Sequence, residues 1–267
     1  MNKRILKISF LATILVSFLF VTSCSDDDSN NNPQSQEITQ AEVKRGLEVD
    51  RISNFIDGLS IDNLSMNRSS SKTNSRFSQP GCPDFSVTEN GYTLTFDNCD
   101  AGDGEIINGT INVSIVIDNN TTTSTITFDN LTFGGNTLNG SKTTSYTLNT
   151  TDGGSFSYSV TSDLSITFED GTTASESGTK TYEITDLNSV DASYTITGNW
   201  TVTIGDDSYS LSTDPSLQGT FSCDYITTGT LIMTENGVSA SINFGDGTCD
   251  NLATVTYPDG TSEEIEL

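Results

Sequence analysis

The densest group of carboxylates in the sequence lies in one short, glycine-containing segment. It consists of Asp97, Asp100, Asp103 and Glu105. Closely spaced carboxylate oxygens are the ligands that Ca²⁺ takes in proteins, so this segment is a candidate calcium site. Its spacing does not match the twelve-residue EF-hand loop, and Cys99 within it favours a cross-linked turn as the alternative. Calcium at this segment is the one cofactor that the sequence suggests; otherwise we expect none.

A second acidic turn, residues 245–251, lies near the C-terminus and contains Asp246 and Asp250. A tight Asp-Gly hairpin turn held by Cys249 is the favoured interpretation. A calcium-binding loop is the alternative.

Histidine is absent from the sequence. This excludes Ser-His-Asp and Cys-His catalysis and removes the commonest general base and zinc ligand. An enzyme built on this chain would have to use carboxylates, tyrosine or lysine. Glycoside hydrolysis needs only two acids about 5 to 9 Å apart, but no local motif indicates such a pair. We therefore expect no catalytic activity.

The charge balance is strongly acidic. The chain contains 11 Lys and Arg against 36 Asp and Glu, a formal net charge of −25, and after Arg76 its only cations are Lys142 and Lys180. Binding to nucleic acid depends on Lys and Arg that neutralise phosphates. Nucleic acid is therefore excluded as a partner.

The five cysteines divide into Cys24 and a set of four, Cys82, Cys99, Cys223 and Cys249. None of the four has the C-x₂-C spacing of a zinc site, and an even set in an oxidising compartment indicates disulfides. Four cysteines allow three pairings. We favour Cys82–Cys99 and Cys223–Cys249, because each pair closes a short loop.

The N-terminus has the pattern of an export signal. Three basic residues precede a largely apolar run over residues 8–21, which is shorter than the about 20 residues of a membrane-spanning helix and typical of a secretory signal peptide. Small residues then precede Cys24, and this arrangement resembles the lipobox of bacterial lipoproteins. The resemblance implies a signal peptide over 1–23, a lipid on Cys24 and attachment to a membrane. An ordinary signal peptide is the alternative.

Residues 25–28, Ser-Asp-Asp-Asp, resemble the acidic export tag of surface lipoproteins from Bacteroidota. This resemblance implies a lipid-anchored protein of the outer membrane that faces the cell exterior, and a simple hydrophilic tether is the alternative. The polar composition of 24–37 predicts a disordered tether.

Apolar residues three and four apart predict an amphipathic helix over 38–60. Thr39 and Glu42 have the spacing of a capping box, and Gly58 suits the end of the helix. Residues 61–80 are polar and predict a linker.

Residues 81–267 predict an all-β domain. Apolar and polar residues alternate, as in 111–117 and 164–168, and Gly-Gly, Asp-Gly and Asn-Gly pairs supply turns. We expect an antiparallel meander of long strands, as a single large curved sheet, a sandwich or a barrel-like fold. A lipid-facing barrel is disfavoured because aromatic girdles are missing.

A divergent repeat of hairpin-like units runs through this domain. An apolar-polar-apolar motif, as in Leu94-Thr95-Phe96, is followed 10 to 16 residues later by Gly-Thr or Gly-Ser, as in Gly109-Thr110. Glycine opposite an aromatic residue on the neighbouring strand is a known sheet device. Chance recurrence in a Thr- and Gly-rich β protein is the alternative.

From residue 38 to the C-terminus the chain resembles a group of uncharacterised lipoproteins from Bacteroidota. The resemblance rests on the helix, on the Cys82-Pro83 start of the β domain and on the ending Asn-Phe-Gly-Asp-Gly-Thr-Cys-Asp-Asn at 243–251. Residues 95–100 resemble an earlier turn of that family but lack its Arg-Lys pair. The resemblance supports an exported location and paired cysteines, and it implies no activity.

The sequence thus predicts a surface-exposed, lipid-anchored β protein with a binding, adhesion or envelope-structural role and a glycan or protein ligand. The alternative is a polysaccharide-binding or carboxylate-based carbohydrate-active protein, with Trp200 as a sugar-stacking platform. An acid-lined groove with exposed aromatic residues would favour this alternative. An open sheet face of threonine and serine would argue against it.

Overall fold

The computed structural model describes residues 37–65, 82–101, 104–147, 156–185, 192–223 and 225–267, with the side chains of 59–65 left out. The predicted signal peptide, Cys24 and the predicted tether up to residue 36 lie outside the described residues. The described part belongs to one compact unit, Gln36–Leu267.

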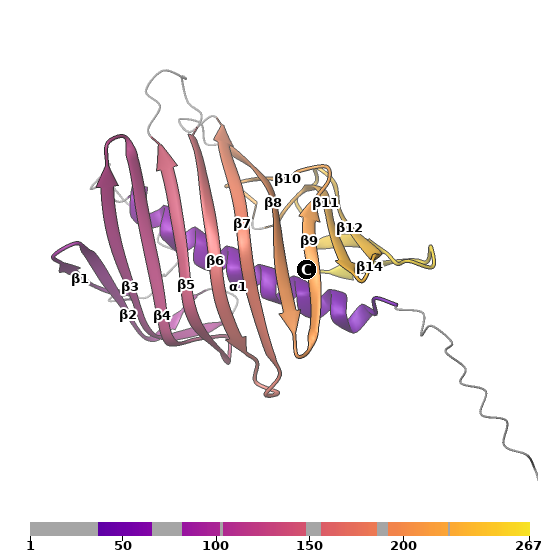
Figure 1. Cartoon of the computed structure of the whole chain (residues 1–267), viewed down its shortest axis with the longest axis horizontal. Helices are drawn as coiled ribbons and strands as arrows, with labels where there is room; N and C mark the ends of the chain where they lie inside the picture. Colours follow the sequence, from indigo (N-terminus) through magenta and orange to yellow (C-terminus); the bar gives the residue numbers. More distant parts are fainter. Residues whose placement is uncertain (1–36, 66–81, 102–103, 148–155, 186–191, 224) are drawn as a thin grey trace, which may run out of the picture. The chain divides into compact units, whose positions relative to one another are not determined.

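The described strands form one 14-stranded antiparallel sheet, which confirms the predicted all-β meander (Figure 1). Each strand from β1 to β8 pairs with its neighbour in sequence, and β10 to β14 continue the order. The strands are β1 (Asp84–Thr88), β2 (Gly91–Asp100), β3 (Ile106–Asp118), β4 (Thr121–Phe133), β5 (Asn136–Thr147), β6 (Phe156–Thr167), β7 (Thr173–Thr185), β8 (Ser193–Ile204), β9 (Asp207–Thr213), β10 (Leu217–Thr220), β11 (Thr228–Glu235), β12 (Val238–Asp246), β13 (Leu252–Thr256) and β14 (Ser262–Glu266).

β9 and β10 together occupy one place in the sheet, between β8 and β11. β9 pairs with one half of β8 and β10 with the other half, and both also pair with β11. The interruption between them contains the cis peptide bond Asp214–Pro215. Proline cannot donate to a sheet ladder, so a break in the strand at this residue follows from the sequence.

A single described α-helix, α1 (Gln40–Ser65), lies across one face of the sheet (Figure 1). The predicted capping box is confirmed: the Thr39 backbone N–H donates to Glu42 Oε2 at 2.6 Å, and the Glu42 N–H donates to Thr39 Oγ1 at 3.4 Å. The helix continues past residue 60 through Gly58, so the predicted stop at this glycine and the predicted linker from residue 61 are wrong at that boundary. Glycine weakens a helix interior by only about 1 kcal/mol, which leaves room for packing to prolong it.

The core lies between α1 and the sheet face beneath it. Val49, Ile52 and Ile56 of the helix are fully buried, and they meet the apolar side of the alternating strands. Strands β2, β4 and β6 bury every second residue, as the period of 2 requires. The predicted alternation is therefore confirmed on these strands.

The predicted hairpin units also match the sheet. The apolar motifs at 94–96, 126–128 and 166–168 begin in β2, β4 and β6, and the glycines that follow the first two lie on the return strands. Phe96 is opposite Gly109, and Phe128 is opposite Gly140. The glycines leave room for the rings on the core face.

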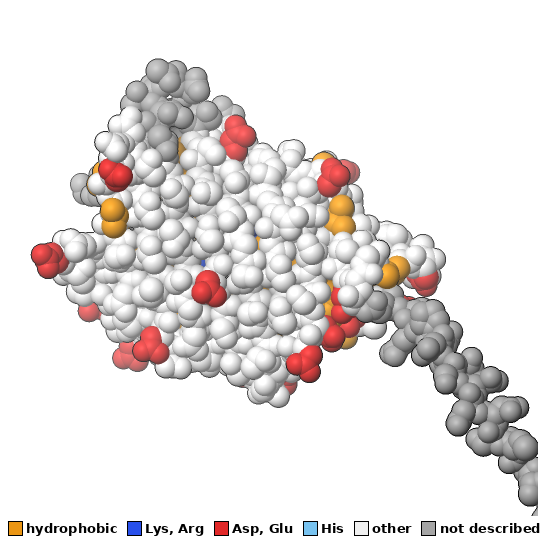
Figure 2. Space-filling model, viewed as in Figure 1, with side chains coloured by type: hydrophobic (Ala, Val, Ile, Leu, Met, Phe, Trp, Pro, Cys, Tyr) orange, Lys and Arg blue, Asp and Glu red, His pale blue; other side chains and the backbone are white. Residues whose placement is uncertain are grey.

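The face of the sheet opposite α1 is open. Figure 2 shows it as almost entirely white, meaning neither apolar nor charged, with the red carboxylates mostly around its margin. The acidity of the chain is therefore distributed unevenly over this surface.

Candidate functional site

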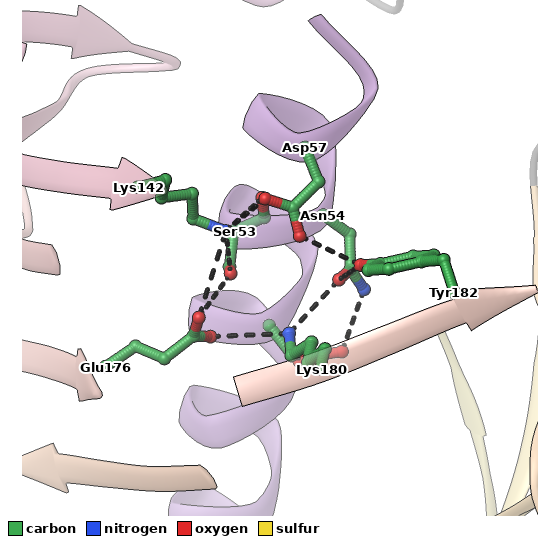
Figure 3. A network of polar contacts seen from close by, with 8 residues as sticks. Ser53, Asn54, Asp57, Lys142, Glu176, Lys180 and Tyr182 are labelled. Atoms are coloured by element: carbon green, nitrogen blue, oxygen red, sulfur yellow. Dashed lines mark hydrogen bonds and ion pairs between the residues drawn. The ribbon is translucent and has the colours of Figure 1, made fainter. Parts of the chain in front are cut away.

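Seven polar residues meet in the dry layer between α1 and the sheet, and four of them are charged on strands or helix without any exposed atom group of consequence (Figure 3). The helix contributes one side of the network and strands β5 and β7 contribute the other. Its members are Asp50, Ser53, Asp57, Lys142, Glu176, Lys180 and Tyr182.

Lys142 lies at the centre of one half of this network. Its Nζ donates to Asp57 Oδ1 and to Ser53 Oγ, both at 2.6 Å, and to the Ser53 carbonyl at 2.9 Å. The Ser53 hydroxyl in turn donates to Glu176 Oε1 at 2.6 Å. Tyr182 donates to the other oxygen of Asp57, Oδ2, at 2.8 Å. All three hydrogens of the ammonium group are therefore directed at acceptors.

Lys180 lies at the centre of the other half. Its Nζ donates to Asp50 Oδ1 at 2.6 Å and to Glu176 Oε2 at 3.5 Å. Asn54 supports Asp50 by donating to its second oxygen at 2.9 Å. Glu176 thus lies between the two lysines, one on each carboxylate oxygen.

Burial and charge act against each other at these groups. Burial alone would raise the pKa of Glu176, but Lys180 and Lys142 outweigh it and hold the pKa below its ordinary value. Burial would likewise lower the pKa of Lys180, and Asp50 with Glu176 raises it instead. Burial and the nearby Asp57 raise the pKa of the Tyr182 hydroxyl, which therefore stays a proton donor.

The network fastens the helix to strands that are far away in sequence. Asp50 and Lys180 are 130 residues apart, and Ser53 and Lys142 are 89 residues apart. Sequence analysis missed this site, although it singled out Lys142 and Lys180 as the only cations after Arg76. An isolated cation in a strand that otherwise faces apolar neighbours is the signal that would have found it, because buried charges require partners.

The open face of the sheet is a second candidate site, for binding. Pairing between strands aligns its side chains in rows, and cross-strand hydroxyls are hydrogen-bonded: Thr161 and Thr179 are 3.0 Å apart. Asp163 is the single charge in the two central rows from β2 to β8. These rows contain Thr93, Asn112, Thr127, Ser141, Asp163, Ser177 and Thr201, and then Ser114, Thr125, Thr143, Thr161, Thr179 and Asn199.

The open face offers hydrogen bonds but no aromatic platform. In strands β2 to β8 the aromatic residues fall on the core side, and Trp200 is 2% exposed. The prediction of Trp200 as a sugar-stacking platform is therefore wrong, because its ring belongs to the core. A face of threonine and serine also argues against sugar handling by aromatics and carboxylates.

Both predicted disulfides are present. Cys82 is bonded to Cys99, and Cys223 is bonded to Cys249. Each bond joins segments that are close in sequence, one at the start of the β domain and one at its end. The choice among the three pairings is thereby confirmed.

The first acidic segment has other partners for one of its carboxylates. Glu105 accepts two hydrogen bonds from the Arg51 guanidinium, at 2.8 and 2.9 Å. Asp97 and Asp100 lie in β2, and Asp103 lies outside the described residues. Among the described residues no group of three or more His, Cys, Asp or Glu is placed to hold a metal ion. Calcium binding by the whole segment stays a prediction.

The second acidic turn is organised by its own backbone. Asp246 accepts hydrogen bonds from the Thr248 hydroxyl at 2.9 Å and the Thr248 N–H at 3.2 Å, and these bonds hold the pKa of Asp246 below its ordinary value. Asp250 accepts from the Leu252 N–H at 3.0 Å. The carboxylates thus stabilise the turn that Cys249 closes, as the favoured interpretation expected.

In the part of the chain that the structure describes, no helix combines the length and the apolar character needed to cross a membrane. Comparison of the chain with family models, with curated proteins and with solved structures found no match in any of the three.

Proposed function

We propose that the chain is a lipid-anchored, surface-exposed binding protein without catalytic activity, whose open sheet face docks on a neutral, hydroxyl-rich polymer. One observation carries the proposal: the central rows of that face consist of Ser, Thr and Asn with one carboxylate, on a chain whose net charge is −25. Hydroxyl groups both donate and accept hydrogen bonds, so they suit a partner that is itself covered with hydroxyls.

Charge supports this choice of partner. The acidic remainder of the chain repels anionic polymers, whereas the open face lets an uncharged polymer approach over many strands. Each hydrogen bond contributes only about 1 kcal/mol net, so binding depends on the number of contacts that a regular face makes at once. This mode differs from aromatic stacking and from acid catalysis, because the groups for both are on the core side.

A matched pair of variants tests the docking face. Thr161→Lys places a charge in the middle of the open face, and Ala41→Lys places the same charge on an exposed position of α1. We expect the full chain to be retained on immobilised neutral glucan and mannan but not on acidic alginate. Thr161→Lys should lower this retention at least tenfold, and Ala41→Lys should leave it unchanged. Equal retention of both variants, or no retention of the unmodified chain, would overturn the docking proposal.

The location is tested separately by protease treatment of intact cells. We expect the β domain to be lost from cells while a periplasmic marker survives. Survival of the β domain would place it inside the outer membrane, and residues 25–28 would then act as a tether only.

A further inference from the structure

We propose that Lys142 and Asp57 join in an intramolecular isopeptide bond, which links α1 covalently to β5. The proposal rests on the arrangement of four side chains around one pair of reacting atoms: the Lys142 amine, the Asp57 carboxyl, the Tyr182 hydroxyl and the Glu176 carboxylate (Figure 3). It is independent of the ligand of the open face.

The two reacting groups already touch. Lys142 Nζ lies 2.6 Å from Asp57 Oδ1, so the nitrogen is next to the carbon that this oxygen is bonded to. Groups held in this way react with effective concentrations on the order of 10⁵ to 10⁸ M. Amide formation from an amine and a carboxyl group is unfavourable in water, but here both partners are held in place by the fold.

The site is dry. The side chain of Lys142 has no exposed surface and that of Asp57 is 2% exposed. A wall of two stacked rings, Tyr158 and Tyr182, lies alongside, with ring centroids 4.8 Å apart. Burying an ion pair costs several kcal/mol per ion, and replacing the pair with a neutral amide removes this cost. Exclusion of water also protects the amide from hydrolysis.

The neighbouring groups can carry each proton. The Lys142 ammonium passes one proton to Asp57 Oδ1, and the nitrogen electron pair then forms a bond to Asp57 Cγ. The negative charge that develops on Oδ2 is stabilised by the Tyr182 hydroxyl, which donates to that oxygen. A second proton leaves the nitrogen through the Ser53 hydroxyl to Glu176 Oε1, along two hydrogen bonds of 2.6 Å.

The last step restores Glu176. Its proton returns to Oδ1, the Cγ–Oδ1 bond breaks and Oδ1 leaves as water. One ammonium and one carboxylate are replaced by a neutral amide and one water molecule, and no oxidant or other reactant is needed. The amide carbonyl oxygen is Oδ2, which keeps its hydrogen bond from Tyr182.

The second pair in the network provides an internal comparison. Lys180 also lies 2.6 Å from a carboxylate, that of Asp50. Its ammonium is additionally held by the Trp200 ring, 4.5 Å from the ring centroid, and by Glu176. These contacts favour the charged form, which is not a nucleophile, so we expect Lys180 to remain unlinked.

The experiment is peptide mass spectrometry on the purified full chain after denaturation and reduction of the disulfides. We expect a branched peptide in which the segments containing Asp57 and Lys142 are joined, lighter than their sum by one water. In Asp57→Asn the leaving group is ammonia, so the branched peptide should have the same mass as in the unmodified chain. Lys142→Arg and Asp57→Ala should lack it, and Glu176→Gln should form it at least tenfold more slowly.

Two results would overturn the proposal. One is complete recovery of the two separate peptides from unmodified chain that circular dichroism shows to be folded, because the network would then be ionic only. The other is a branched peptide that joins Lys180 to Asp50 instead. The unmodified chain decides between these outcomes, so a variant that fails to fold does not affect the conclusion.

Discussion

Lys180 Nζ lies 4.5 Å from the centroid of the Trp200 ring, and both side chains are buried on the core side of the sheet. A cation over an aromatic ring contributes about 2 kcal/mol when water is excluded. The ring therefore completes the environment of a charge that two carboxylates hold from other directions. This explains how a lysine can lie inside the core of a protein with so few cations.

Replacement of this cation should be costly. Lys180→Met leaves Asp50 and Glu176 with an unpaired charge in the core, and removal of one partner of a buried pair destabilises by about 3–5 kcal/mol. Urea denaturation measures the loss. Lys44→Met is the matched control, because Lys44 is exposed on α1 and surface changes are usually within about 0.5 kcal/mol. A similar small loss for both variants would show that the network contributes little.

Stability should fall at both ends of the pH range. The pKa of Glu176 is lowered from 4.5, so its contribution is present above that value and is lost as the pH falls through the lower folded value. The pKa of Lys180 is raised from 10.5, so its contribution is present below 10.5 and is lost only as the pH rises above it. Urea midpoints between these limits should be nearly constant with respect to both groups.

Glu176→Gln tests the assignment of the acid limb. This variant should be less stable than the unmodified chain at neutral pH, and the difference should narrow below about pH 4.5 as the carboxylate of the unmodified chain becomes protonated. A constant difference across the acid range would assign that limb to other carboxylates.

Gly178 should tolerate no side chain. A Cβ atom built there lies 2.6 Å from Trp200 Cα and 2.7 Å from Trp200 Cβ, and the backbone φ is +137°. Overpacking costs about 1–3 kcal/mol in addition to backbone strain, so thermal unfolding of Gly178→Ala should show a large loss. Gly171→Ala is the control, because its φ is +83° but no heavy atom lies within 4 Å. Equal losses would mean that strain alone matters.

The C-terminal disulfide should contribute substantially to stability. Cys223 and Cys249 are separated by 26 residues, and in the loop-entropy model such a link stabilises by about 3 kcal/mol. The double variant Cys223→Ser and Cys249→Ser should lose about this amount in urea denaturation. Added reductant should destabilise the unmodified chain further than the double variant, since the latter retains only Cys82–Cys99.

Much of the sheet could be predicted because its strands alternate visibly. In β4, Ile126 and Phe128 alternate with polar residues, and the buried face is the one that they mark. The disulfides could also be predicted, since each closes a short loop. In β5 the same reasoning fails, because Gly140, Lys142 and Thr144 occupy the core-facing positions and no apolar pattern identifies them.

The polar network could not be derived for a related reason. Asp50 and Asp57 lie on the buried side of α1, where an apolar stripe is expected, so the helix does not reveal which face it packs. Their partners are on strands that are many residues away, and a local pattern contains no information on such pairings. The end of the helix was misplaced because packing, and not Gly58, determines how far it runs.

The order of the chain has a consequence for how this protein reaches its final structure. Synthesis is N-terminal first, so α1 is complete before any strand exists, while its buried carboxylates require lysines 89 and 130 residues away from their helical neighbours. The hairpins of the sheet can form one after another from local contacts, which are made quickly. The first element to be made is therefore the last that can settle, and until Lys180 is available the acidic side of the helix remains in water.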